Sequence, residues 1–401
     1  MPWKKTDQLS EQQKFIIAWQ GEALTPFSEL CRRFGISRKS GYKRVARFNE
    51  FGLRGIGDLS SAPLSHPNQT PAEVVEMPDD RREQLVRAKR HNMLLGPKKL
   101  VVMLAAAHPE IEFPAASTAS DILKANGLVI NRRRSRKSAP WAEPFSDAQR
   151  PNDIWCADFK GWFLTGDRVR CNPLTMSDAA SRYLINCTGL LRPNYEQTRP
   201  IFELAFREFG LPLAMRTDNG PPFSTTSLGG LSRLAIYWIK LGIIPERIRP
   251  GHPEENGRHE RMHRTLGEAV ASPPKASMRA QQRAFDWFLV YYNEVRPHEA
   301  LGQKTPANVY YRSDRDYPVR VDEPEYQEGV SVRRVRTNGE IRWKGGKVFL
   351  SEALVGEPVG LKQISERLWA IYYGPLEIGL LDESTMKTIK TPVKVLPRCP
   401  D

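Results

Sequence analysis

The sequence predicts a multidomain protein: α-helical units at the N-terminus, an α/β core with a mixed five-stranded sheet, and a small β-barrel at the C-terminus. At 401 residues the chain exceeds what one hydrophobic core usually organises. Apolar residues follow helical spacing in the first third, whereas strand and helix patterns alternate across residues 150–312. Short β-rich runs separated by turn residues fill residues 325–395 and predict the barrel.

Residues 1–57 predict a helix-turn-helix DNA-binding domain. Gly35 is suited to the end of one helix and Ser37 to the cap of the next, between two apolar-periodic stretches. In such motifs the second helix enters the major groove of DNA. A plain helical hairpin with a solvated basic face is the alternative. The candidate DNA contacts on the second helix are Arg38, Lys39, Lys43 and Arg44.

A Gly-, Pro- and Ser-rich linker is expected at 58–79, followed by a second helix-turn-helix or winged-helix domain at 80–130. Its expected helices are 81–90, 97–107 and 119–126. Residues 131–149 are expected to be a basic linker whose charge DNA phosphates would neutralise, although a solvated linker fits the charge run equally well. The basic residues of this run are Arg132, Arg133, Arg134, Arg136 and Lys137.

The core at 150–312 is expected to begin with three strands joined by tight turns, which should therefore be antiparallel. The later strands follow helices and should be parallel, because a crossover connection returns the chain in the same direction. In chain order the expected strands are 154–164, 168–176, 181–190, 213–216 and 243–248, and the expected helices are 195–209, 230–241 and 254–271. Further along, Asn338-Gly339 predicts a hairpin in the C-terminal β-rich region.

The charge balance indicates a polyanionic partner. Sixty Lys and Arg residues against 46 Asp and Glu give a formal net charge of +14, and nucleic acid is the usual partner of so basic a protein. A ribosome-associated or merely basic protein is the alternative.

The cysteines and the hydropathy pattern bear on the cellular compartment of the protein. The five cysteines are scattered without a CxxC pair, so neither a disulfide framework nor a cysteine-based zinc site is expected. No apolar stretch of about 18 residues predicts a membrane span, and no signal-peptide core is present. We therefore expect a protein of the reducing cytoplasm.

Three acidic residues stand at positions suited to metal chemistry. Asp158 lies within the first core strand, Asp218 follows the strand after a crossover helix, and Glu260 lies on the last core helix. An acid among strand-forming apolar residues is costly to bury unless it is paired or binds a metal. Ligands collect at the carboxyl ends of strands in open α/β sheets. Two magnesium ions about 4 Å apart activate water and stabilise a leaving oxygen, and carboxylates hold them.

Residues 150–312 resemble the integrase core of insertion-sequence transposases and retroviral integrases. The resemblance rests on segments 151–158, 177–183, 216–223, 253–266 and 292–298, with Leu301 and Thr305-Pro306. It implies an RNase H-like fold and a DDE transposase whose catalytic metal ligands are Asp158, Asp218 and Glu260. The chain departs from the family in a longer spacing between Asp218 and Glu260, whose excess we assign to 224–230, and in the acidic pair Glu254-Glu255.

The resemblance also implies a reaction and its partners. Two Mg²⁺ ions, for which Mn²⁺ is able to substitute, would support hydrolysis at the ends of a DNA element. The freed 3′-OH would then attack target DNA. The expected partners are double-stranded DNA, as element terminal repeats and as target, and further copies of the chain on DNA. No membrane partner is expected, and the expected location is the bacterial cytoplasm at the nucleoid.

Two other functions compete. His259, Glu260 and His263 form an HExxH sequence, in which two histidines on one helix face bind zinc in peptidases. That hypothesis leaves Asp158, Asp218 and the net charge unexplained and lacks a third zinc ligand. The second alternative is a DNA-binding regulator with an inert core, against which the intact acid triad argues.

Overall fold

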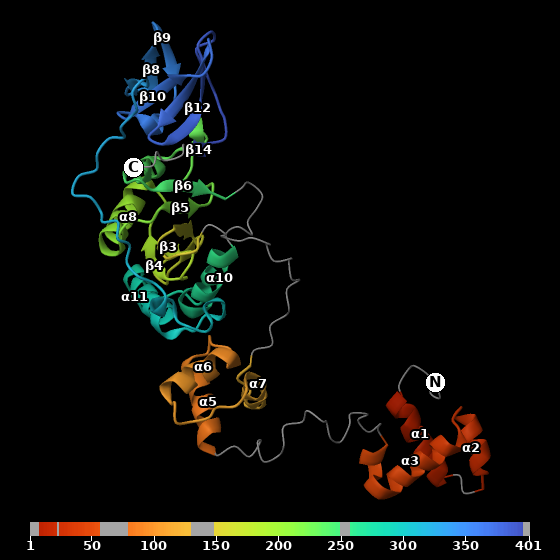
Figure 1. Cartoon of the computed structure of the whole chain (residues 1–401). Coiled ribbons are helices and arrows are strands. Elements are labelled where there is room, and N and C mark those ends of the chain that lie inside the picture. The colour runs from red at the N-terminus through yellow and green to blue at the C-terminus, as the bar shows by residue number, and fades with distance from the viewer. Residues whose placement is uncertain (1–7, 22–23, 57–78, 130–147, 249–256, 396–401) are drawn as a thin grey trace. The chain divides into compact units, whose positions relative to one another are not determined.

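The computed structural model describes residues 8–21, 24–56, 79–129, 148–248 and 257–395, and the chain forms two compact units, Met1–Val75 and Glu76–Asp401 (Figure 1). Each unit has a hydrophobic core of its own. Among the described residues, no helix is long and apolar enough to cross a membrane.

The first unit packs three helices, α1 (Gln8–Gly21), α2 (Phe27–Arg33) and α3 (Arg38–Phe51), followed by a 3-10 turn at Gly52–Gly55. Phe15, Leu30 and Ile36 are buried at its centre. The predicted turn and cap are confirmed. Gly35 adopts φ +64°, a left-handed conformation that glycine tolerates best, and the Ser37 side chain accepts a hydrogen bond from the Ser40 amide at 3.1 Å.

The second unit begins with α5 (Asp79–His91), α6 (Pro97–Ala107) and α7 (Ala116–Ala125). The last of these starts three residues earlier than the sequence predicts. Described residues 79–129 contain no strand, so the predicted winged form has no counterpart there. The basic run at 132–137 lies outside the described residues.

A mixed sheet forms the middle of the second unit. Its long strands lie in the order β4-β3-β1-β5-β6, and the two-residue β2 pairs with β3. The β1–β3 and β3–β4 pairs are antiparallel, whereas β1–β5 and β5–β6 are parallel, which confirms the predicted directions. The strands are β1 (Ile154–Phe159), β2 (Phe163–Leu164), β3 (Arg170–Asp178), β4 (Leu184–Leu190), β5 (Ala214–Thr217) and β6 (Ile244–Arg247).

The prediction of five strands was wrong by one. The expected run 154–164 breaks at 160–162, and the chain resumes as β2. Gly161 has φ +90° at this break, a conformation that ends regular pairing.

Alternation along β1 assigns one face of the sheet to the core and the other to the candidate site. Trp155 and Ala157 belong to a hydrophobic cluster with Phe202 and Phe206 of α8 (Tyr195–Phe209) and Trp238 of α9 (Arg233–Lys240). Cys156 and Asp158 point the opposite way, because side chains alternate along a strand.

Two further helices complete the core. Side chains of β3 contact α10 (Gly257–Leu266) on the face that Asp158 shares, and the π-helical turn Gly267–Ala271 continues α10. Next come α11 (Met278–Val290) and a second π-helical turn, Tyr291–Val295. α11 packs on β4.

The C-terminal region folds as β-strands in two sheets. One has the order β13-β12-β11-β10-β7, with β14 paired to β12, and the other is the β8–β9 hairpin. Asn338-Gly339 forms a turn, with the Arg336 amide donating to the Glu340 carbonyl at 2.9 Å. The predicted hairpin there is wrong, since β7 pairs with β10 and not with β8. The strands are β7 (Ser331–Arg334), β8 (Glu340–Trp343), β9 (Gly346–Phe349), β10 (Pro358–Gln363), β11 (Leu368–Tyr373), β12 (Leu376–Asp382), β13 (Lys387–Ile389) and β14 (Lys394–Val395).

The segment 224–230 is a folded loop. A bridge between Ser224 and Leu231 closes it, and Leu228 is buried. A Cβ atom added at Gly379 of β12 would lie 2.5 Å from the Leu228 side chain. The segment therefore packs against the C-terminal sheet through Leu228.

Candidate active site

Asp158 and Asp218 occupy matching positions on neighbouring strands. β1 and β5 are parallel, and their register pairs Ala157 with Thr217, the residue before each aspartate. Adjacent strands lie about 4.8 Å apart. The two aspartates are therefore neighbours at the carboxyl ends of two parallel strands, where the sequence placed a ligand site.

The turn after β5 holds Asp218. The Gly220 amide donates to Asp218 Oδ1 at 3.2 Å, and Asn219 Nδ2 donates to the Ile248 carbonyl at 2.9 Å. Burial raises the pKa of the Asp218 carboxyl, and the hydrogen bond from Gly220 opposes that rise. A cation near this carboxylate would favour its charged form.

Two histidines of α10 pack onto the sheet beside Asp158. His259 is only 2% exposed, and its Nε2 lies 2.6 Å from Thr175 Oγ1. His263 Nε2 lies 2.7 Å from the same oxygen, and its Nδ1 lies 3.9 Å from Asp158 Oδ2. Burial lowers the pKa of His259 to about 3 and that of His263 to about 2, so both rings are neutral near pH 7. Sequence reasoning did not place either ring against Asp158.

Asp158, His259 and His263 form a group of possible metal ligands. One ligand atom from each residue lies within 4.8 Å of the other two. Asp158 thereby supplies the third ligand that the HExxH hypothesis lacked. Such a mixed set of ring nitrogens and a carboxylate is typical of zinc, whereas magnesium prefers oxygens alone. His259 Nδ1, however, already lies 3.1 Å from Ser177 Oγ, and both Nε2 atoms contact Thr175.

Glu260 lies apart from this group. Its side chain is exposed, and consecutive residues of a helix point about 100° apart, so it diverges from His259. Of the three predicted metal ligands, the structure brings Asp158 and Asp218 to neighbouring strand ends and leaves Glu260 on the adjoining helix, outside that group of ligand atoms.

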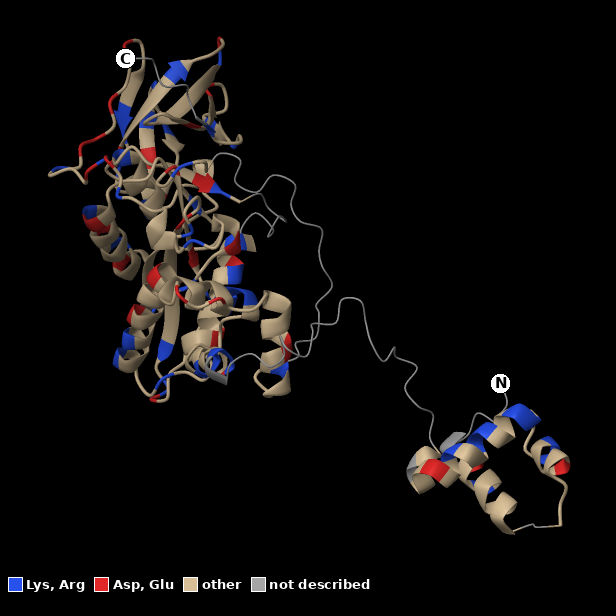
Figure 2. Ribbon diagram, turned by 60° about the horizontal axis from the view of Figure 1, so that its bottom comes forward, with Lys and Arg blue, Asp and Glu red and all other residues tan. Residues whose placement is uncertain are grey.

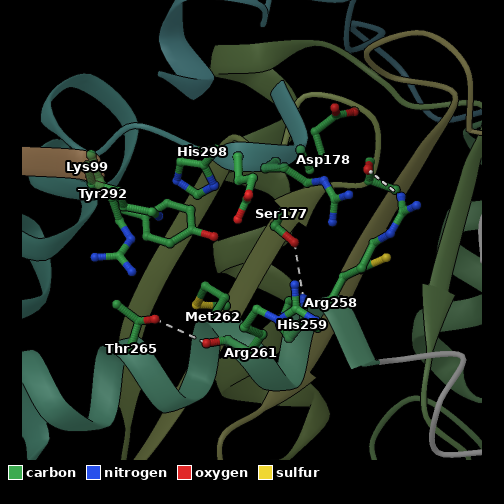
Figure 3. Close-up of a pocket in the computed structure, with 16 residues that line it drawn as sticks. Lys99, Ser177, Asp178, Arg258, His259, Arg261, Met262, Thr265, Tyr292 and His298 are labelled. Atoms are coloured by element: carbon green, nitrogen blue, oxygen red, sulfur yellow. Dashed lines mark hydrogen bonds between the residues drawn. The ribbon is translucent and has the colours of Figure 1, made fainter. Parts of the chain in front are cut away.

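A basic cavity of about 210 Å³ lies along the same face of the sheet (Figure 3). Arg182, Arg258 and Arg261 line it together with Arg296 and Lys99. Sequence reasoning missed these residues as a site. Arg182 and Arg296 both lie in the segments that carry the family resemblance, and that was the available signal.

The candidate DNA contacts of α3 divide into two kinds. Arg38, Lys39 and Lys43 are exposed, whereas Arg44 is partly buried and its Nη1 donates to the Ile56 carbonyl at 3.0 Å. Figure 2 shows Lys and Arg in blue along the helices of this unit. The candidate residues Arg132 to Lys137 lie outside the described residues.

Comparison with known proteins identifies the core. Residues 148–253 and 241–306 match two models of the integrase core domain. The chain is 28% identical over 183 residues to an uncharacterized 39.2 kDa protein of insertion element IS476 from Xanthomonas euvesicatoria, covering 45% of this chain and 50% of that protein. It is 27% identical over 207 residues to the Escherichia coli transposase InsD of element IS2, covering 49% and 63%. The chain thus spans about half the length of the first of these relatives.

Two solved structures are also similar. The catalytic core domain of HTLV-2 integrase in complex with magnesium has a TM-score of 0.32 and 18% identity, covering 40% of this chain and 98% of that one. A chain of the simian T-cell lymphotropic virus intasome with PP2A regulatory subunit B56 gamma has a TM-score of 0.37 and 16% identity, covering 78% and 99%.

The mixed sheet and the matched family models define residues 148–306 as an integrase core domain. That domain is the part of the chain that matches the integrase family, and the relatives of the chain include insertion-element transposases. These matches lend no support to the zinc peptidase or to the DNA-binding regulator.

Proposed function

We propose that this protein is a transposase that cleaves DNA at the ends of a mobile element and joins the freed 3′-OH to target DNA. The observation that carries the proposal is the pair Asp158 and Asp218, at matching ends of neighbouring parallel strands in an integrase core domain. Phosphoryl transfer of this kind needs little covalent chemistry from the protein and depends on positioning and charge stabilisation.

The donors at this edge of the sheet fit divalent cations. Both aspartates offer hard oxygen ligands, and Asp158 is 16% exposed, so it is accessible from solvent yet partly shielded. Asp158 and Asp218 would hold Mg²⁺, or Mn²⁺ in its place, and Glu260 would join them from α10. Ions bound there would activate water and stabilise charge on the attacking and leaving oxygens.

Other residues and regions of the chain would support this function. The Gly220 amide aims Asp218, and the contacts of His259 and His263 with Thr175 fix α10 on the sheet. Residues 1–57 would act as a helix-turn-helix that recognises element ends, with Arg38, Lys39 and Lys43 facing DNA. The helical unit 80–130, the basic linker 131–149 and a small barrel at 325–395 would extend the DNA contact. Two ends must be joined, so we propose that copies of the chain assemble on DNA.

The test is a cleavage and joining assay. The full chain is incubated with duplexes that carry the DNA flanking its own reading frame, with Mg²⁺ or Mn²⁺. We expect nicking and joining that Asp158→Asn and Asp218→Asn each reduce at least about 100-fold while DNA binding is retained. The control is Asp314→Asn, since Asp314 is an exposed acid outside the site.

Three outcomes would overturn the proposal. The first is a wild-type chain that neither nicks nor joins DNA. If such a chain binds the element end specifically in Mg²⁺ and in Mn²⁺, it is the DNA-binding regulator. The second is an Asp218→Asn variant that stays fully active. The third is zinc-dependent proteolysis, which would point to the HExxH peptidase.

A further inference from the structure

The basic cavity beside α10 concentrates positive charge that the protein does not neutralise. Five basic side chains line it, against two acidic ones, Asp178 and Glu299. Both acids are engaged elsewhere: Asp178 accepts hydrogen bonds from the Asn152 and Ser181 amides, each at 2.7 Å, and Glu299 pairs with Lys98. Among the described residues, Lys99, Arg182, Arg261 and Arg296 have no ion-pair partner.

Two donors in this cavity are buried without a partner. Within the described structure, Arg182 Nε and Arg296 Nη1 have no hydrogen-bond partner. A buried donor without an acceptor is costly. Burial and the neighbouring Arg296 lower the pKa of Lys99 to about 8, as expected where cations crowd together. Arg182 also has φ +66°, a strained conformation for a non-glycine residue, and such strain concentrates at ligand sites. An anion in the cavity would offer acceptors to Arg182 Nε and Arg296 Nη1.

The cavity adjoins the candidate active site. Cys156 and Ser177 line it and form a cross-strand pair, and Asp158 and Thr175 form the next pair on the same face. Residues two apart on a strand are about 7 Å apart. His259, which also lines the cavity, contacts both Ser177 and Thr175. Figure 3 shows α10 with Arg261 and Thr265 along one side of the cavity, and Tyr292 and His298 across from it.

We propose that this cavity binds a phosphate of the DNA backbone next to the phosphodiester that faces Asp158, through Arg182, Arg261 and Arg296. The proposal rests on the transposase function and adds a site to it. Arginine matches phosphate because its planar fork donates several hydrogen bonds at once. A phosphate held there would fix the register of the strand relative to the aspartates.

The test measures DNA binding without catalysis. A labelled duplex of the element end is titrated with the full chain in EDTA at several salt concentrations. We expect Arg261→Gln and Arg296→Gln each to weaken binding about tenfold and to reduce the salt dependence by about one phosphate contact, 0.9 in the slope of log K against log salt. Arg264→Gln is the matched control, because Arg264 is an exposed residue of the same helix that does not line the cavity.

A second arm uses duplexes that carry one neutral methylphosphonate at successive positions around the cleaved bond. At one position the neutral linkage should weaken binding by the wild type and add nothing in Arg296→Gln, since both changes remove the same contact. Calorimetry with inorganic phosphate separates the other source of this chemistry. Binding of inorganic phosphate that Arg296→Gln abolishes, with unaltered DNA binding, would assign the cavity to a small free anion and overturn the proposal.

The outcomes separate this proposal from the transposase function. Unchanged salt slopes in both cavity variants, or an equal effect of Arg264→Gln, would overturn the phosphate site even if the wild type cleaves DNA. Slopes that change as expected in a chain that never cleaves DNA would leave the site standing and overturn the function.

Discussion

His263 of α10 places its Nδ1 3.9 Å from Asp158 Oδ2 of β1, while its Nε2 lies 2.7 Å from Thr175 Oγ1 of β3. His259 contacts the same threonine oxygen from one turn earlier. The hydroxyl group of Thr175 is therefore within hydrogen-bond distance of both imidazole rings. This contact and the buried Met262 and Leu266 together hold α10, which carries Glu260, on the core.

Replacement of Thr175 by valine tests this dependence. The change keeps the shape of the side chain and leaves both rings without the threonine oxygen, at a cost of about 1–3 kcal/mol per unsatisfied group. We expect urea unfolding to show a lower free energy of unfolding for the full chain. Thr188→Val is the control, because it removes one bond of a half-buried hydroxyl, to Asn186. Equal losses in the two variants would contradict a special role for Thr175.

The buried histidines predict a dependence of stability on pH. The folded-state pKa of His259, about 3, lies below the unfolded value of about 6.5. The unfolded chain therefore binds protons that the folded chain excludes. The contribution of these histidines to the free energy of unfolding is fully present above about pH 6.5. It is lost as the pH falls below that value, by about 1.4 kcal/mol per pH unit for each such histidine.

Chemical unfolding at several pH values below neutrality measures this slope. We expect His259→Gln to flatten it relative to the wild type. Thr188→Val should leave it unchanged, because that side chain carries no group that titrates in this range. A wild-type slope that is flat between about pH 6.5 and pH 5 would contradict the prediction.

The close packing of α3 on α2 predicts that Gly41 tolerates no larger side chain. A Cβ atom there would lie 2.6 Å from Cys31 Sγ and 3.0 Å from the Phe27 ring. Gly41→Val should therefore destabilise the first unit by about 1–3 kcal/mol. Amide hydrogen exchange should speed up in α3 and stay unchanged in β1 and β3. Gly21→Ala is the control, because nothing lies within 4 Å of that position.

Experiments on the basic candidates of α3 should distinguish residues that contact DNA from a residue that stabilises the fold. Lys39→Gln and Lys43→Gln remove exposed charges and should weaken DNA binding and lower its salt dependence, without a change in stability. Arg44→Gln removes the bond to the Ile56 carbonyl and should lower the melting temperature of the first unit. An Arg44→Gln variant that loses only DNA affinity would contradict this assignment.

Much of the fold follows from local sequence pattern. Helix α8 begins and ends where apolar spacing and Gly210 place it, and the strand directions of the core follow from the lengths of the connections. The sequence pattern failed to predict strand partners that lie far apart in the chain. The turn at Asn338-Gly339 is local and forms, but the partner of β7 is β10, which is distant in sequence.

The sequence by itself determined that Asp158 lies within one core strand, that Asp218 follows another and that Glu260 lies on a helix, because strand and helix periodicities are local properties of the chain. Only the tertiary structure decided which side chains meet. It set the register of β1 against β5, turned His259 and His263 toward Thr175, and gathered Arg182, Arg261 and Arg296 around one cavity. These contacts join residues far apart in the chain, and only strand pairing and the packing of α10 on the sheet bring them together.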